Sequence, residues 1–177
     1  MVILMIGPIG VGKTMLGRYA AERRPDMYPF YDLEEEFQHR KGCLSIDYTN
    51  KNGAQACLDA CQEIIQQIAS QNIKRNCLIE VCNSAFTDAS MAFNWLLHSN
   101  HTLLTIYASP SVLSRREPLS IIRTPEDFLI YEYCPERRVI YNLARPNYLD
   151  VSNLTELEAK EKFLNFLENE LFLVSLS

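Results

Sequence analysis

Short, fully apolar runs alternate with longer amphipathic stretches along this chain. A run such as 2–6 is too short for a helix and is typical of a strand buried on both faces. The runs that predict strands are 2–6, 27–33, 77–82, 102–107 and 148–151. Strands separated by helices indicate a parallel sheet with helices on both faces. We therefore expect an α/β fold.

The segments between these runs predict helices. We expect helices over 14–24, 34–41, 53–70 and 89–97, a helix that begins over 111–116, and a largely helical stretch over 125–144. Pro135 is expected to break or kink the last of these. Thr155 and Glu158 form a capping box that opens a final helix. Its apolar positions predict core packing: Leu157, Phe163, Leu164, Leu167 and Leu171.

Length and composition narrow the class of protein. The 177 residues match one ordinary domain, and no repeat, linker or low-complexity segment divides them, so we expect a single domain over 1–177. A hydrophobic content of 47% excludes collagen-like and disordered chains. The apolar runs are too short to span a bilayer, and the first of them leads straight into a glycine loop rather than forming a signal peptide. The sequence thus predicts a cytoplasmic protein without a membrane partner.

Charge and cysteine content exclude further classes. Seventeen Lys and Arg against 22 Asp and Glu give a net charge of −5. Because no basic tract is present, we expect no nucleic-acid partner. The six cysteines contain no C-x-x-C spacing, which favours reduced, buried thiols over disulfides or a zinc site.

Residues 7–14 read Gly-Pro-Ile-Gly-Val-Gly-Lys-Thr and match the phosphate-loop pattern G-x-x-x-x-G-K-[ST] between a predicted strand and helix. Glycines let backbone N–H groups turn toward phosphate oxygens, and the helix start adds its positive end. Lys13 is expected to reach the β- and γ-phosphates, and Thr14 to ligate Mg²⁺. The predicted nucleotide-binding residues are Gly7, Pro8, Ile9, Gly10, Val11, Gly12, Lys13, Thr14 and Met15. We therefore expect ATP and Mg²⁺ as cofactors.

Three carboxylates are candidates for chemistry near this loop. Asp32 follows an apolar strand, where ligands collect in open α/β sheets, although a solvated loop carboxylate is the alternative. Glu34 is a candidate base for an attacking hydroxyl. Glu80 is the lone carboxylate of the run 77–82. Burying a carboxylate in an apolar strand costs free energy unless a partner compensates its charge. We expect it near Mg²⁺ and Thr14, the alternative being an exposed strand end.

Arginines gather between the last two predicted strands, at positions 115, 116, 123, 137 and 138. Guanidinium groups match the negative charge of a phosphoryl group in transfer. We select Arg137 and one of Arg115 or Arg116, and expect others of the set to be solvated surface. The predicted catalytic residues are then Lys13, Asp32, Glu34 and Arg137, and the predicted metal ligands are Thr14, Asp32 and Glu80.

Several stretches of the chain are similar to the shikimate kinase family. The phosphate loop leads into Gly17-Arg18, and the second strand runs into Asp32-Leu33-Glu34. Residues 114–119 are similar to the family's adenine-side arginine and the start of its lid. Residues 137–144 are similar to its R-x-x-x-Y-x-x-x-A helix. The similarity extends over nearly the whole chain.

This resemblance implies a P-loop NTPase fold, a five-stranded parallel sheet in the order 2-3-1-4-5, and MgATP-dependent phosphorylation of a small molecule's hydroxyl group. It implies that Asp32 lies beside the metal and that Glu34 faces the acceptor hydroxyl. Arg115 or Arg116 would lie on the adenine. Arg137 would reach toward the phosphate or the acceptor, and a mobile lid would cover about 116–137.

The departures from the family concern the acceptor. Its D-x-D is Asp32-Leu33-Glu34 here, and its glycine triplet after the third strand is replaced by 81–84, Val-Cys-Asn-Ser. Its acceptor-side arginine aligns with Cys57, and the lid reads Glu-Pro-Leu-Ser over 117–120. Each change removes a group that would grip shikimate, so we expect a different acceptor.

The sequence thus predicts an ATP-dependent phosphotransferase that acts on the alcohol group of a small molecule, as a monomer or weak dimer. Two alternatives stay open. One is a nucleoside or nucleotide kinase of the same fold, with Asn83, Phe86 or Trp95 contacting a base. The other is a regulator that binds ATP without catalysis, which the altered acceptor motifs would favour.

Overall fold

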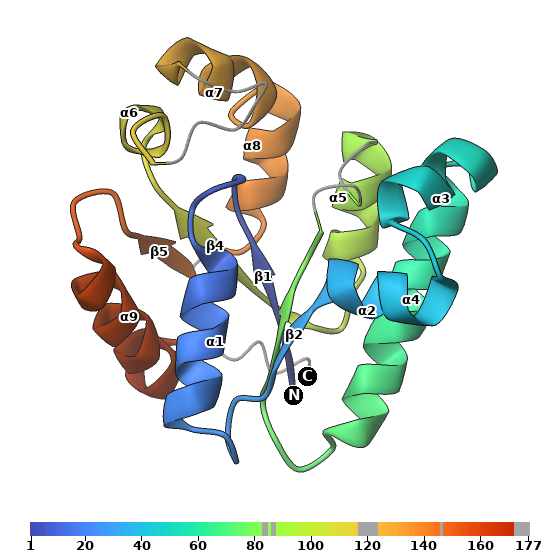
Figure 1. Cartoon of the computed structure of the whole chain (residues 1–177), viewed down its shortest axis with the longest axis horizontal. Helices are drawn as coiled ribbons and strands as arrows, with labels where there is room; N and C mark the ends of the chain where they lie inside the picture. Colours follow the sequence, from blue (N-terminus) through green and yellow to red (C-terminus); the bar gives the residue numbers. More distant parts are fainter. Residues whose placement is uncertain (83–84, 86–87, 117–123, 146, 172–177) are drawn as a thin grey trace.

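In the computed structural model, which describes residues 1–82, 85, 88–116, 124–145 and 147–171, the described strands form one parallel sheet (Figure 1). The five strands follow the order β2-β3-β1-β4-β5. They are β1 (Val2–Ile6), β2 (Phe30–Asp32), β3 (Cys77–Glu80), β4 (Thr102–Tyr107) and β5 (Tyr148–Asp150). The predicted α/β class and the implied strand order are confirmed.

Strand β1 shows why its sequence has no polar position. Successive side chains of a strand point to opposite faces of the sheet. Val2, Leu4 and Ile6 join one buried cluster, whereas Ile3 and Met5 join the other. Because both faces are covered, all five residues are buried.

Helices cover both faces of the sheet (Figure 1). One cluster packs the sheet against α2 (Leu33–Lys41), α4 (Ala54–Gln71), α5 (Ala89–Leu97) and α8 (Pro135–Asn142). The other packs it against α1 (Lys13–Arg23) and α9 (Glu156–Asn165), which continues as π-helical turns over Phe166–Glu170. Two short helices, α6 (Pro110–Leu113) and α7 (Pro125–Tyr131), pack together after β4. This arrangement brings the carboxyl ends of the strands to one edge of the molecule.

Helix α3 (Ser45–Asn52), which packs on α4, was not predicted from the sequence. Its residues are mostly polar, and none of its own side chains caps its start. Glu34 of α2 instead accepts a hydrogen bond from the backbone N–H of Ser45 at 2.9 Å. A contact from another helix therefore stabilises the first turn of α3, and such a contact leaves no local sequence pattern.

The expected break at Pro135 is confirmed, and it separates two helices. Helix α7 ends at Tyr131, and Pro135 is at the first position of α8. Proline suits this position because its fixed φ fits the helix and its missing N–H would have no partner there.

The last helix begins with the predicted capping box, since Thr155 accepts from the N–H of Glu158 and Glu158 accepts from the N–H of Thr155. Phe163, Leu164 and Leu167 are buried as expected. The expectation for Leu157 was wrong, because 64% of this residue is exposed. At about 100° per residue it lies about 120° around the helix from Phe163, outside the buried stripe.

All six cysteines are free thiols, and four of them are buried: Cys57, Cys61, Cys77 and Cys82. Among the described residues, no helix is long and apolar enough to cross a membrane.

Gly17 provides a test of how α1 packs on the sheet. A Cβ at this position would lie 2.2 Å from Cδ2 of Phe30 on β2. We expect Gly17→Ala to force the ring or the helix aside and to lower the free energy of unfolding by about 1–3 kcal/mol. Urea denaturation would measure the loss, with Arg18→Ala, an exposed neighbour on α1, as the control. An unchanged midpoint for Gly17→Ala would contradict this packing.

Candidate active site

The phosphate loop joins the end of β1 to the start of α1. Gly12 is the N-cap of α1, with φ of 100°, and no side chain caps the first N–H groups of the helix. Gly7 lies so close to β4 that a Cβ there would be 2.2 Å from the carbonyl oxygen of Ile106. The loop therefore leaves the uncapped, positive end of α1 available to an anion.

Lys13 is buried within this loop, with 5% of the residue exposed. Its Nζ donates to the carbonyl oxygens of Gly7 at 3.1 Å and Pro8 at 3.2 Å. It also lies 3.6 Å from Oε1 of Glu80. Burial lowers the pKa of Lys13, and the negative charge of Glu80 partly offsets this effect. The ammonium group is thus held over the loop by partners that phosphate oxygens could replace.

Glu80 lies beside Thr14, as expected because a carboxylate buried in an apolar strand needs a polar partner. The Thr14 hydroxyl donates to Oε2 of Glu80 at 2.7 Å. Burial raises the pKa of Glu80, and the nearby Lys13 ammonium partly opposes the shift. The sheet register places Asp32 next to Glu80 on the neighbouring strand. The structure therefore brings together the three predicted metal ligands, Thr14, Asp32 and Glu80.

The donor chemistry of these residues suits Mg²⁺. They supply one hydroxyl and two carboxylates, which are hard oxygen ligands. Within the described residues, no three histidine, cysteine or acidic side chains gather into a metal cage. Mg²⁺ in phosphate-transfer sites usually takes one or two carboxylates together with substrate phosphates and waters. A pair of carboxylates beside the phosphate loop fits that pattern.

Asp32 and Glu34 lie at the start of α2 and already have partners. Oδ1 of Asp32 accepts from the N–H groups of Glu34 at 2.9 Å and Glu35 at 3.4 Å, so Asp32 caps the helix. Glu34 accepts from both the backbone N–H and the hydroxyl of Ser45. Both carboxylates are therefore fixed in orientation, and the role of Glu34 as a base stays a prediction.

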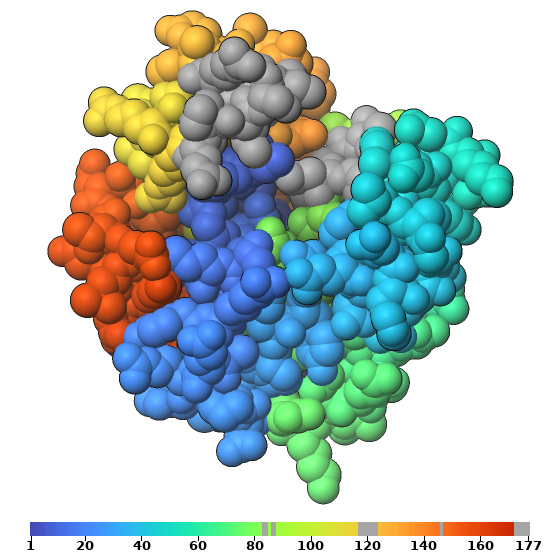
Figure 2. All heavy atoms as spheres, viewed as in Figure 1, coloured from blue at the N-terminus to red at the C-terminus, as the bar shows by residue number. Residues whose placement is uncertain are grey.

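A cavity of about 270 Å³ opens beside the loop. Figure 2 shows this face hollowed between the dark blue N-terminal segment and the light blue region of α2, with green atoms at its floor. The residues that line the cavity are Asp32, Glu34, Ser45, Ile46, Glu80, Val81 and Cys82. The cavity lies at the carboxyl ends of β2 and β3, where open α/β sheets bind ligands.

Glu132, at the end of α7, was missed by the sequence analysis. It is buried, and its Oε2 accepts from the N–H of Ile9 in the phosphate loop at 3.1 Å and from the Tyr141 hydroxyl at 3.2 Å. Its Oε1 accepts from Nη1 of Arg137 at 2.7 Å. The signal that could have found it is the one used for Glu80, a lone carboxylate in the mostly apolar run 128–134.

The strand order, the loop and the helices around it can be compared with solved structures. The fold resembles that of shikimate kinases. The Aquifex aeolicus enzyme has a TM-score of 0.63 and 24% identity, with 95% of this chain and 96% of that chain covered. The Bacteroides thetaiotaomicron enzyme has a TM-score of 0.67 and 18% identity, with 95% of this chain and 97% of that chain covered. The Acinetobacter baumannii enzyme in complex with shikimate has a TM-score of 0.62 and 20% identity, with 94% of this chain and 90% of that chain covered.

No protein-family model matches the sequence, and comparison with curated protein sequences finds no match. The similarity to shikimate kinases is therefore one of fold.

On this shikimate kinase-like fold, Arg116 rather than Arg115 contacts the phosphate loop. Its guanidinium donates to the carbonyl oxygens of Val11 at 3.1 Å and Val151 at 3.4 Å. Arg115 is exposed. The adenine role of either residue stays a prediction. Arg123, Asn83 and Phe86 lie outside the described residues, as does the part of the predicted lid over 117–123.

Cys57, which the sequence resemblance aligned with the family's acceptor-side arginine, is fully buried in α4. Its thiol donates weakly to the carbonyl oxygen of Ser45, at 3.7 Å. This position packs α4 against α3 and supplies no cation to the cavity.

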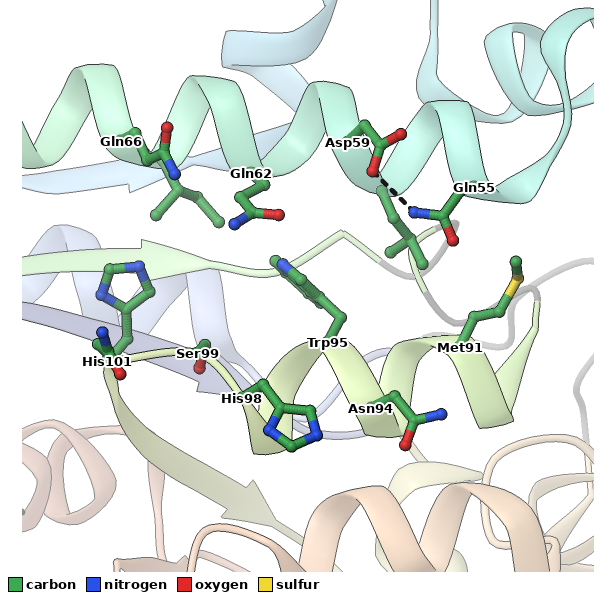
Figure 3. Close-up of a pocket in the computed structure, with 13 residues that line it drawn as sticks. Gln55, Asp59, Gln62, Gln66, Met91, Asn94, Trp95, His98, Ser99 and His101 are labelled. Atoms are coloured by element: carbon green, nitrogen blue, oxygen red, sulfur yellow. Dashed lines mark hydrogen bonds between the residues drawn. The ribbon is translucent and has the colours of Figure 1, made fainter.

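Trp95 lies in a different cavity, of about 450 Å³, between α4 and α5 (Figure 3). Polar side chains such as Gln62 and Asn94 surround it there. No residue that lines this cavity also lines the one beside the phosphate loop. The structure therefore does not place Trp95 where it could contact an acceptor at the loop.

Proposed function

We propose that this protein is a kinase that transfers the γ-phosphoryl group of ATP to a hydroxyl group of a small molecule. The observation that carries the proposal is the grouping of Lys13, Thr14 and Glu80 at a phosphate loop that opens on the cavity beside Asp32. The resemblance of the fold to shikimate kinases supports it.

In the proposed reaction, the acceptor oxygen forms a bond to the γ-phosphorus while the bond from that phosphorus to the bridging oxygen of ADP breaks. The hydroxyl proton passes to a carboxylate of the cavity or to water, and ADP leaves. Lys13 would exchange its bonds to Gly7 and Pro8 for phosphate oxygens. The first N–H groups of α1 would bind the same phosphates.

The remaining residues would position the reactants. Bound Mg²⁺ would neutralise charge on the phosphates. Thr14, Asp32 and Glu80, which lie together beside the phosphate loop, would hold it. Glu34 lines the acceptor cavity and would accept a hydrogen bond from the acceptor hydroxyl. The region over about 116–137 would act as a lid that excludes water.

The test is ADP release from MgATP with shikimate and with a panel of sugar acids, polyols and nucleosides, using Lys13→Met as the blank. Stimulation by a panel member, absent in the blank, is the expected result. Binding of ATP without stimulation by any acceptor would contradict a kinase and favour an ATP-binding regulator.

Stimulation by nucleosides alone would move the acceptor assignment to the nucleoside kinase alternative. We do not favour that alternative, because the described aromatic candidate, Trp95, lies in the other cavity.

A further inference from the structure

Three buried thiols meet where α4 packs on the sheet near the end of β3. Cys57 and Cys61 lie one turn apart on α4, and Cys82 follows the last residue of β3 by two positions. All three belong to one buried cluster, and they are 0%, 0% and 7% exposed, respectively. The Cys61 thiol is in hydrogen-bond contact with the thiols of both Cys57 and Cys82. Cys61 is therefore the central member of the group.

Cys82 is the member of this group that a small solute can reach. It lines the cavity of about 270 Å³ beside the phosphate loop, and Cys61 is not among the described residues that line it. A water molecule takes up about 30 Å³ in the liquid, so a cavity of this size has room for a solute of a few atoms. Hydrogen peroxide is such a solute, and it oxidises thiols.

The geometry favours a bond between Cys61 and Cys82 over one between Cys57 and Cys61. Side chains four positions apart on a helix have Cβ atoms about 5–6 Å apart. A disulfide requires Cβ atoms at about 3.5–4.5 Å. A bond within α4 would therefore distort the helix, whereas Cys61 and Cys82 come from separate segments whose thiols are already in contact.

We propose that Cys61 and Cys82 are an oxidant-sensitive thiol pair, which hydrogen peroxide converts to a disulfide at the wall of the cavity beside the phosphate loop. This inference goes beyond the proposed kinase function and does not depend on it. Disulfides in a reducing compartment are usually transient and redox-sensing, so the pair would act as a reversible sensor of peroxide.

The reaction has two steps. The Cys82 sulfur attacks one oxygen of hydrogen peroxide, the O–O bond breaks, and water leaves as Cys82 becomes a sulfenic acid. The Cys61 sulfur then attacks the Cys82 sulfur, and the sulfenic hydroxyl leaves with the Cys61 proton as a second water. Hydrogen bonds with the Cys57 and Cys82 thiols, together with burial, raise the pKa of Cys61, which suits it to react second. The thiols lose two electrons and two protons, and the peroxide becomes two waters.

The first test maps the disulfide after the folded protein has been treated with hydrogen peroxide. The remaining thiols are blocked with N-ethylmaleimide, and the unfolded protein is cleaved at acidic residues. Asp59 lies between Cys57 and the next cysteine, and Glu80 lies between Cys77 and the next cysteine. Cleavage at these two positions therefore separates both proposed partners from their neighbouring cysteines, so mass spectrometry can identify the bonded pair.

We expect the disulfide between Cys61 and Cys82 to be about tenfold more abundant than one between Cys57 and Cys61, because of the spacing of side chains on a helix. The intact protein should lose the mass of two hydrogen atoms, and dithiothreitol should restore it. A main product that joins Cys57 to Cys61 would overturn the proposal. Oxidation confined to the half-buried Cys43 and Cys134 would also overturn it.

Single replacements test the two roles separately. Cys61→Ala removes the second thiol of the reaction, so Cys82 should gain oxygen and should be labelled by dimedone when the oxidised protein is unfolded. Cys57→Ala is the matched control, since it removes the third thiol of the group, and it should form the disulfide in wild-type yield. Loss of the disulfide in folded Cys57→Ala, or no oxidation of Cys82 in folded Cys61→Ala, would overturn the assignment. If a variant does not fold, the map of the wild-type protein still decides.

Discussion

Replacing Lys13 with methionine is expected to lower the affinity for ATP about 100-fold. The lysine ammonium would make charge-assisted hydrogen bonds to phosphate oxygens, worth about 3 kcal/mol, and about 1.4 kcal/mol corresponds to a factor of ten. Methionine keeps the length and apolar stem but offers no donor. Isothermal titration with the non-hydrolysable analogue of ATP in the presence of Mg²⁺ measures the change.

Lys74→Met is the matched control, because Lys74 is exposed and precedes β3, at the opposite end of the sheet from the phosphate loop. Its affinity should equal that of the wild type. The circular dichroism spectrum of Lys13→Met should stay native, because methionine keeps most of the apolar stem of the buried lysine. Affinity within a factor of three of the wild type would show that Lys13 does not face the phosphates.

Replacing Glu132 with alanine is expected to reduce the free energy of unfolding by about 3–5 kcal/mol, the usual loss when one partner of a buried ion pair is removed. The variant leaves the Arg137 guanidinium, the N–H of Ile9 and the Tyr141 hydroxyl without the carboxylate that they share. For a chain of this size the melting temperature should fall by about 6–20 °C.

Urea denaturation followed by circular dichroism measures this loss. Glu126→Ala, on the exposed side of α7, should change the free energy of unfolding by less than about 0.5 kcal/mol. Adding Arg137→Ala to Glu132→Ala should recover part of the stability, because no uncompensated charge then stays buried. A loss below about 1 kcal/mol for Glu132→Ala would mean that water replaces the carboxylate.

The features that the sequence predicted well are those with local causes. Strand β1 is a fully apolar run next to a glycine loop, and the capping box of α9 lies within four consecutive residues. Glu80 was found because a lone carboxylate in a buried strand requires a partner, and the partner is Thr14.

The features that the sequence missed depend on contacts between distant segments. The first turn of α3 is capped by Glu34, which accepts a hydrogen bond from the N–H of Ser45, and no residue pattern within α3 predicts that bond. Glu132 contacts Ile9, which precedes it by 123 positions, so neither residue alone indicates the pair. Arg137 was a candidate from the sequence, but its ion pair with Glu132 was not predicted, because composition does not show which charged side chains are buried together.

The central position of β1 has a consequence for how this chain folds. Val2 pairs with Cys77 and Ile3 pairs with Thr102, so β1 is synthesised well before both of the strands that it pairs with. Closing such long loops costs chain entropy before any contact forms, which slows folding. Until residue 107 has left the ribosome, 2–6 is an apolar segment without its full set of partners, and this segment is where protection by a chaperone would matter most.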